Sequence, residues 1–417
     1  MNSLDSSAPI SDSVPSREMG DATRWMKIAV ALWISFGVAV GVKALVQPTR
    51  HAVYPTFADA SRRWWQDESL YTRGYYYSPV FAVALTPIAL LPKTLGGIVW
   101  GTLGLAFLFW CLRVFFRSVI APLRDGLDEG KYLLLCLAPS VHGAWSGQSN
   151  MLLLGLVLLT ATCALQGRWW RAALLLAMAV HVKVWVLALA ALFAVRHWRA
   201  LLPRLAVCLL AVAVLPLLTR PPLHVVDSYQ QFHACLVERF AEAERWGGYR
   251  DAWTMWEAVA APEPAIYKAL QVVSGLLAAA WCLRQARRGV TGPAFLLGAL
   301  AMWVCWQLLF GSGTERLTYG ILAPAAGWAV LESFAAKRHR ILALGAWLFT
   351  GPLGTGDVER LLLRAIPFAQ AMMPLGVAML ALWLALCERS LPGSSAIQRS
   401  PRPRFARRPA TALELRA

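Results

Sequence analysis

Residues 168–199 read RWWRAALLLAMAVHVKVWVLALAALFAVRHWR, an apolar run with a basic cluster at each end and His181 and Lys183 near its centre. A single membrane span would place one basic cluster on the outer side, against the positive-inside bias. Two short helices that fold back at Lys183 keep both clusters on the inner side. We therefore expect a helical hairpin here, with its lysine pointing toward the outer face.

The composition of the whole chain indicates a membrane protein. Hydrophobic residues make up 58% of it and charged residues only 15%, with a mean hydropathy of +0.51. A soluble domain does not carry this much apolar surface. The net charge of +17 comes from Arg and Lys at the ends of apolar runs, where positive-inside bias and anionic lipid explain them. We therefore expect membrane lipids as partners and no nucleic acid.

Apolar runs of membrane-crossing or somewhat shorter length recur along the chain. A membrane span needs about 20 residues, and the candidate helices are 25–46, 97–116, 131–147, 149–167, 201–219, 266–283, 291–311, 317–335, 341–353 and 367–387. With the hairpin added, the sequence predicts an all-α, polytopic transmembrane protein with about 12 membrane segments. Both termini are expected in the cytoplasm, and the expected location is the cell inner (plasma) membrane.

The chain divides into three parts by composition. Residues 1–24 form a polar cytoplasmic tail, residues 25–388 the transmembrane domain, and residues 389–417 a basic cytoplasmic tail held to anionic lipid. Two long outer loops, 47–96 and 220–265, interrupt the transmembrane domain. Their aromatic and apolar positions are typical of helices that lie along the membrane interface.

The first outer loop groups acidic and basic side chains beside membrane-seeking tryptophans. Asp59, Arg62 and Arg63 have the i, i+3, i+4 spacing that shares one face of a helix. A carboxylate beside two guanidinium groups suits a catalytic base next to a phosphate. An interfacial helix with an ordinary ion pair explains the same spacing, so both interpretations stay open.

Three further polar groups lie at the outer ends of apolar runs. Gln148 and Asn150 offer amides that suit sugar hydroxyls or phosphate oxygens, or that satisfy backbone groups at a helical hairpin. Lys183 needs an anion or water, or must extend to the interface. Glu315 and Arg316 suit either a substrate or a local ion pair.

At these residues the chain resembles glycosyltransferase family 87, the polyprenyl-phosphate-mannose-dependent mannosyltransferase-like group of the GT-C superfamily. The resemblance covers roughly residues 50–200. It is carried by an ordered set of features, namely Val53-Tyr54 and the stretch on to Trp65, Leu70-Tyr71, Tyr77-Ser78-Pro79, Pro87 to Pro92, Gly147-Gln148-Ser149-Asn150 and Lys183. It implies a GT-C-like fold for the transmembrane domain, with interfacial helices in the first outer loop.

The resemblance also implies a catalytic base in that loop. The family usually carries its acid just ahead of the Val-Tyr pair, where this chain has Arg50 and His51. The role therefore moves to the nearest acid, Asp59, and His51 and Asp67 are alternative bases.

The implied activity is that of a hexosyltransferase, inverting in mechanism. It would move a mannose-like sugar from a polyprenyl-phosphate donor to a lipid or glycan acceptor on the outer face. Asp59 would take the acceptor proton, and Arg62 or Arg63 would stabilise the leaving phosphate together with Lys183. The expected substrate-binding residues are Arg62, Arg63, Tyr77, Gln148, Asn150, His181, Lys183, Glu315 and Arg316. No cofactor is expected and no metal-ligand spacing is present, although a divalent ion stays open.

Two other classes of protein stay open as alternatives. A polytopic lipid or solute transporter would also use intramembrane polar groups and a basic inner face. A catalytically inactive GT-C-like scaffold is suggested by Arg50 and His51 at the position of the family acid. Two large outer loops and no evident internal repeat favour the transferase.

Overall fold

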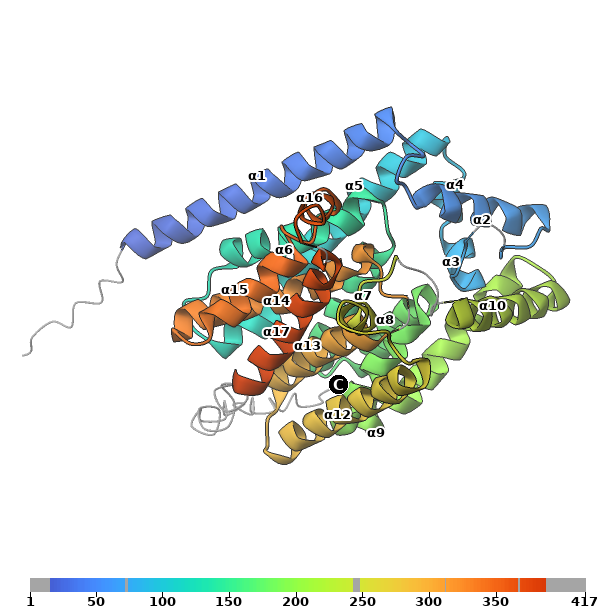
Figure 1. Cartoon of the computed structure of the whole chain (residues 1–417). Coiled ribbons are helices and arrows are strands. Elements are labelled where there is room, and N and C mark those ends of the chain that lie inside the picture. The colour runs from blue at the N-terminus through green and yellow to red at the C-terminus, as the bar shows by residue number, and fades with distance from the viewer. Residues whose placement is uncertain (1–15, 72–73, 243–247, 312, 367, 388–417) are drawn as a thin grey trace, which may run out of the picture.

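The computed structural model describes residues 16–71, 74–242, 248–311, 313–366 and 368–387. Within these ranges the regular structure is helical, apart from one isolated antiparallel bridge between Tyr249 and Glu315. The expected all-α fold is therefore confirmed for the described residues (Figure 1). The predicted basic tail at 389–417 lies outside them.

The helices bear the labels of Figure 1. They are α1 Ser16–Val46, α2 Tyr54–Gln66, α3 Pro79–Ala84, α4 Thr86–Ala89, α5 Lys93–Phe115, α6 Glu129–Trp145, α7 Asn150–Leu165, α8 Trp169–Val182, α9 Leu187–Ala213, α10 Pro222–Glu242, α11 Ala252–Glu257, α12 Pro264–Arg287, α13 Gly292–Phe310, α14 Ala323–Ala336, α15 Arg340–Thr350, α16 Gly356–Leu362 and α17 Met372–Cys387. Helix α1 begins at Ser16, so the last residues of the predicted polar tail are helical.

Helix length and composition make the chain a multi-pass membrane protein. In the described part, 6 helical stretches are long and apolar enough to cross a membrane. They are Asp21–Val46, Lys93–Leu123, Val184–Leu218, Pro264–Arg287, Gly292–Phe310 and Ala369–Cys387. Helices α7, α8 and α15 are apolar but shorter. The expected count of about 12 membrane segments stays a prediction.

The hairpin predicted at Lys183 is present. Helix α8 ends at Val182, and Lys183 is extended at φ −147° and ψ 115°. The rings of Trp169 and His197 lie 4.9 Å apart. The two basic clusters that flank the run therefore lie at the same end of the bundle, as the charge pattern indicates.

Helix α9 contains a second reversal, at His197. This residue has non-helical angles, φ −120° and ψ 24°. A straight helix rises 1.5 Å per residue, which would place Leu209 about 39 Å from Lys183. Instead, the His181 Nε2 atom lies 3.2 Å from the Leu209 carbonyl oxygen. The chain therefore folds back at His197.

The bundle has two chemically different ends. At the basic end, Arg113 and Arg117 pair with Glu129 at 2.7 and 2.8 Å, and Arg124 pairs with Glu332 at 2.5 Å. The other end, here called the loop end, carries α2, α3, α4 and α10 side by side (Figure 1). The first outer loop thus contains three helices, as expected, and they gather over one end of the bundle.

Helix α13 lies in the core of the bundle, and α1 lies at its edge. In the most apolar stretch of α13, 72% of the residues are buried, whereas in that of α1 only 17% are. Some polar atoms in the core are paired internally: Trp33 Nε1 donates to the Leu133 carbonyl at 3.0 Å, and Trp383 Nε1 donates to Ser333 Oγ at 2.6 Å. Trp303 Nε1 and Trp328 Nε1 are buried without a hydrogen-bond partner among the described residues.

Candidate functional site

The first outer loop is fastened to the turn between α6 and α7. The Val53 amide donates to the Ser146 carbonyl at 2.8 Å, and proline at the start of α2 suits the first turn of a helix. The buried face of α2 presents Phe57. Its ring packs edge-on against Tyr77 at 4.9 Å and Trp100 at 5.8 Å. This packing places the loop directly over the α6–α7 turn.

Gly147 makes that turn tight. It has a φ of +65°, a conformation that favours glycine. Its carbonyl accepts a hydrogen bond from Trp100 Nε1 at 2.8 Å. A Cβ atom at Gly147 would lie 3.5 Å from the Trp100 ring and 3.8 Å from Tyr54. Gln148 and Ser149 follow this turn directly, and α7 begins at Asn150.

These side chains form a buried polar group, here called the Gln148 cluster: Tyr77, Gln148, Ser149 and Asn150. The Tyr77 hydroxyl donates to Gln148 Oε1 at 2.8 Å, and Ser149 Oγ donates to the Tyr77 hydroxyl at 3.1 Å. Asn150 Nδ2 donates to the Leu317 carbonyl at 2.8 Å. Asn150 Oδ1 is buried and has no hydrogen-bond partner among the described residues. The cluster therefore contains a buried acceptor that a ligand or water can use.

Tyr77 is influenced by a nearby cation and by a carboxylate. The Lys183 ammonium lies 5.6 Å from the centre of the Tyr77 ring and 5.9 Å from that of Trp185, within cation–π range. Burial raises the pKa of Tyr77, the Ser149 hydrogen bond lowers it, and the Glu315 carboxylate raises it further. A cation and a carboxylate thus act on the same buried side chain.

His181 joins the first outer loop to the hairpin. Its carbonyl accepts from Ser78 Oγ at 2.7 Å, while its ring lies against the Leu209 carbonyl. The structure therefore brings His181 close to the Gln148 cluster, but both of these contacts hold elements together. Its predicted contact with substrate stays a prediction.

Asp59 lies in a more exposed setting, here called the Asp59 group: Asp59, Arg62 and Lys93. Asp59 Oδ1 lies 3.2 Å from Arg62 Nη1 and 3.7 Å from Lys93 Nζ. The Asp59 side chain is 40% exposed. Arg63, expected beside Asp59, donates to the Ser69 carbonyl at 3.4 Å. The second cation beside Asp59 is therefore Lys93, which the helical spacing did not indicate.

The two alternative bases lie at the ends of this loop segment. His51 is exposed, with φ +50°, and its carbonyl accepts from Lys43 Nζ at 3.2 Å. Asp67 caps α2 with φ +65°, and its carboxylate lies 2.9 Å from His224 Nδ1. Asp67 thereby links the first outer loop to the second.

A buried ion triad lies beside the loop that carries Glu315. It comprises Arg250, Arg316 and Glu359. Arg250 Nη2 and Arg316 Nη2 each lie 2.7 Å from a different carboxylate oxygen of Glu359. Burial raises the pKa of Glu359, but the two guanidinium groups lower it by more, so the net shift is downward. Glu359 therefore holds two cations from separate loops.

The triad fixes the loop that faces the Gln148 cluster. The Arg250 amide donates to the Thr314 carbonyl at 2.8 Å, and the Tyr319 hydroxyl donates to the Arg250 carbonyl at 2.7 Å. Arg250 and Glu359 lie 109 residues apart, so no local sequence pattern connects them. Sequence reasoning missed both residues for that reason.

The described residues contain no group of three or more His, Cys, Asp or Glu side chains that could hold a metal ion. The side chains of the Gln148 cluster are amides and hydroxyls, which suit hydroxyl groups and phosphate oxygens better than a metal.

Comparison with known proteins gives one family. The model of glycosyltransferase family 87 matches residues 75–310, more than half of the chain. The matched segment includes Tyr77, Gln148 and Lys183, begins after Asp59 and ends before Glu315. The curated proteins gave no match. A polytopic helical chain with this match belongs to glycosyltransferase family 87 and is a membrane glycosyltransferase.

Proposed function

We propose that the protein moves a mannose-like hexose from a polyprenyl-phosphate donor to a hydroxyl group of a lipid or glycan acceptor, with inversion at the sugar. The reaction takes place at the loop end, beside the Gln148 cluster. One observation carries this proposal: the Lys183 ammonium lies 5.6 Å from the centre of the Tyr77 ring, and the loop that carries Glu315 is joined to the same cluster by the hydrogen bond from Asn150 to the Leu317 carbonyl. A cation for the leaving phosphate and a carboxylate for the acceptor proton thus lie on two segments that meet at the Gln148 cluster.

Lys183 stabilises the phosphate as it leaves. The acceptor oxygen bonds to the anomeric carbon, the bond from that carbon to the phosphate oxygen breaks, and the electron pair stays on the phosphate. A partly buried ammonium interacts with that charge more strongly than one in water. The donor already carries an activated sugar, so the proposed reaction needs no cofactor.

Gln148 and Asn150 orient the sugar. Asn150 Oδ1, which lacks a partner in the described part, accepts from a sugar hydroxyl. The Nε atom of Arg316 is also buried without a partner there, and it supplies a donor to an oxygen of the substrate. Arg62 and Arg63 stay candidates for phosphate contact near the interface.

Two carboxylates compete for the role of base. The Glu315 carboxylate raises the pKa of Tyr77. The backbone of Glu315 is held by the bridge to Tyr249. Asp59, predicted from the sequence, is held by two cations on α2. Because the loop that carries Glu315 contacts the cluster through the hydrogen bond from Asn150 to the Leu317 carbonyl, we propose Glu315 as the base and keep Asp59, His51 and Asp67 as alternatives.

The orientation follows from charge. We place the basic end and both termini in the cytoplasm, and the loop end on the outer face of the inner membrane, because arginine and lysine accumulate on the cytoplasmic side. A lipid-linked donor then approaches the Gln148 cluster from the bilayer.

The test is glycosyl transfer by purified protein in liposomes. Radiolabelled polyprenyl-phosphate mannose and glucose serve as donors, and total membrane lipid supplies acceptors. Glu315→Gln is expected to lower kcat by about 10²- to 10⁴-fold, the usual contribution of a general base. Asp59→Asn is the matched control, with an expected loss below about tenfold.

Thermal unfolding of each variant shows whether the loss is chemical. If Asp59→Asn loses all transfer activity while Glu315→Gln keeps it, the base would be Asp59 on α2. No transfer from either donor by the wild type would overturn the proposed donor class.

A further inference from the structure

An apolar groove, here called the α1–α5 groove, lies on the outside of the bundle, where α1 runs beside α5 (Figure 1). Its volume is about 600 Å³. Trp33 and Phe109 line it, with ring centres 5.5 Å apart. Val38 also lines it and is 60% exposed. The groove therefore opens on the apolar surface of the bundle, where hydrocarbon is the solvent.

Gly37 keeps the middle of this groove open. A Cβ atom there would meet no heavy atom within 4 Å, so a larger side chain fits without displacing a neighbour. The groove extends along α1 from Val30 to Leu45, a distance of about 22 Å in a helix. One leaflet of the hydrocarbon core is about 15 Å thick. The groove is therefore long enough for the full length of an acyl chain.

The two helices run antiparallel along the groove. The Trp33 ring lies against Phe109, whereas a Cβ atom at Gly41 would lie 3.8 Å from the methyl carbon of Thr102. Residue numbers therefore fall along α1 as they rise along α5. The start of α1 and the end of α5 meet at one end of the groove, and this is the basic end of the bundle.

Two cations lie one helical turn beyond the lining at that end. On α5, the Arg113 guanidinium lies 5.8 Å from the centre of the Phe109 ring. On α1, Lys27 precedes Val30 by three residues, so the two share one face of the helix. Lys27 is exposed and has no ion pair among the described residues. An apolar channel therefore ends beside a cation that is available to a ligand.

Basic side chains outnumber acidic ones around this end. Arg113 and Arg117 share the carboxylate of Glu129. A Cβ atom at Gly130 would clash with the backbone of Met26, so the start of α1 packs directly on the start of α6. The segments 21–30, 109–117 and 128–131 hold five basic and three acidic residues, namely Arg24, Lys27, Arg113, Arg117 and Lys131 against Asp21, Asp128 and Glu129. The local charge is therefore positive.

We propose that the α1–α5 groove binds an anionic phospholipid of the phosphatidylglycerol type, from the leaflet at the basic end. One acyl chain lies in the groove, and the phosphate lies beside Lys27 and Arg113. The apolar lining matches the chain, and the positive charge attracts a headgroup with a net negative charge. A zwitterionic headgroup has no net charge and gains less from these cations. The inference does not depend on the proposed sugar transfer.

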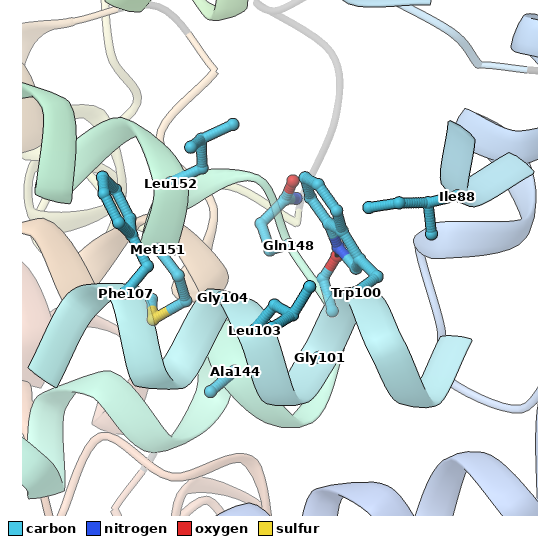
Figure 2. Close-up of a pocket in the computed structure, with 11 residues that line it drawn as sticks. Ile88, Trp100, Gly101, Leu103, Gly104, Phe107, Ala144, Gln148, Met151 and Leu152 are labelled. Carbon is cyan, nitrogen blue, oxygen red and sulfur yellow. Dashed lines mark hydrogen bonds between the residues drawn. The ribbon is translucent and has the colours of Figure 1, made fainter. Parts of the chain in front are cut away.

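A smaller pocket on other residues of α5 is a separate feature. It lies between α5 and α7 and has a volume of about 150 Å³. Figure 2 shows Gln148 and Trp100 in its lining. Because Gln148 belongs to the Gln148 cluster, this pocket adjoins the proposed reaction site. A phospholipid in the α1–α5 groove leaves that pocket free.

Photo-crosslinking to a phospholipid tests the inference without requiring transfer. The probe is phosphatidylglycerol with a diazirine midway along one acyl chain. Full-length protein in phosphatidylcholine nanodiscs that contain a small fraction of probe is irradiated, and the labelled residues are mapped by mass spectrometry. Labelling is expected on Ile34 or Leu105, which line the groove. Excess unlabelled phosphatidylglycerol should compete, and further phosphatidylcholine should not.

A bulky side chain in the groove tests the position of the acyl chain. Gly37→Leu is expected to reduce groove labelling about tenfold, because each methylene that loses its apolar site costs about fourfold in affinity. Ala280→Leu adds apolar bulk to the exposed face of α12 and is the matched control, with unchanged labelling expected. Thermal unfolding shows that both variants fold.

A charge variant tests the position of the headgroup. Lys27→Gln is expected to lower the preference for phosphatidylglycerol over phosphatidylcholine about fivefold, the contribution of one basic side chain near an anionic headgroup. Arg199→Gln removes an exposed arginine of another basic cluster and should leave the preference unchanged. Lys27 is exposed, so this variant tests the inference even if Gly37→Leu does not fold.

Four outcomes would overturn the inference. They are labelling spread evenly over the lipid-facing helices, full groove labelling of a folded Gly37→Leu protein, equal competition by the two phospholipids, and an unchanged lipid preference in Lys27→Gln. A disulfide-linked dimer that forms with Gly37→Cys but not with the wild type would place a second copy of the chain in the groove instead.

Discussion

Asp59 and Glu359 are carboxylates that each lie between two cations, but their surroundings are opposite. Asp59 contacts Arg62 and Lys93 on the exposed side of α2. Glu359 contacts Arg250 and Arg316, and its side chain is only 5% exposed. The first group is visible in the sequence as a helical spacing, whereas the second is formed by residues from three separate parts of the chain, with Glu359 on α16.

The difference shows where charge can organise a site. An exposed ion pair contributes about 0–1 kcal/mol, because water competes for both groups. Removing one partner of a buried pair costs about 3–5 kcal/mol, because the other charge stays buried and unpaired. The buried triad, and not the Asp59 group, is therefore expected to hold the loop that carries Glu315.

The largest expected effect on stability comes from Glu359. Glu359→Ala leaves the Arg250 guanidinium buried beside Arg316, and the free energy of unfolding is expected to fall by about 3–5 kcal/mol. Unfolding in detergent micelles, followed by circular dichroism, measures it. Asp59→Ala is the matched control, with an expected loss of about 0–1 kcal/mol. Equal losses in the two variants would remove the distinction between the groups.

The dependence of stability on pH tests the role of Glu359 in the same comparison. The pKa of Glu359 is lowered below its usual value of 4.5. A carboxyl group with a lowered folded pKa stabilises the protein above its unfolded pKa, and this contribution is lost as pH falls through the folded pKa. The melting temperature is therefore expected to fall below a pH of about 4.5. Glu359→Gln should flatten this part of the profile, and an unchanged slope would contradict the assignment.

The hydrogen bonds of the Tyr77 hydroxyl are between neutral groups, so their loss is expected to have an intermediate effect. Tyr77→Phe removes the hydroxyl that contacts Gln148 and Ser149. A neutral hydrogen bond contributes about 1 kcal/mol, so kcat/KM is expected to fall by about fivefold. The Gln148→Glu variant in the same assay shows whether the amide itself is needed. Unchanged kinetics in both variants would place the substrate elsewhere.

The smallest expected effect belongs to the exposed pair. Arg62→Gln removes one cation from Asp59, and the free energy of unfolding is expected to change by less than about 1 kcal/mol. The change should shrink further at high salt, because screening weakens exposed charges. Unfolding at low and high ionic strength measures it, and a large salt-independent loss would mean that this pair is effectively buried.

The sequence predicted features that depend on local patterns. The charge clusters at both ends of residues 168–199 predicted the reversal at Lys183, because each cluster must stay on the same side. The Tyr77 and Gln148 motifs were also recognised, and the structure joins them by a hydrogen bond. Local spacing indicated that Asp59 and Arg62 pair, which the structure confirms.

Features that depend on distant contacts were not predictable in the same way. Arg250 and Glu359 meet across 109 residues, and Lys93 reaches Asp59 from a different helix. None of these pairings leaves a periodic signal in a single segment, so packing of the whole bundle is needed to reveal them.

The most direct test compares two lysines in the liposome transfer assay. Lys183→Met removes the cation beside the Tyr77 ring, and kcat/KM is expected to fall by about 10²- to 10³-fold, as for loss of a group that stabilises developing charge. Lys93→Met removes a cation from the Asp59 group and is expected to change kcat/KM by less than about threefold. If both variants fold and Lys93→Met loses more kcat/KM than Lys183→Met, the result would contradict the account and place the reaction on α2.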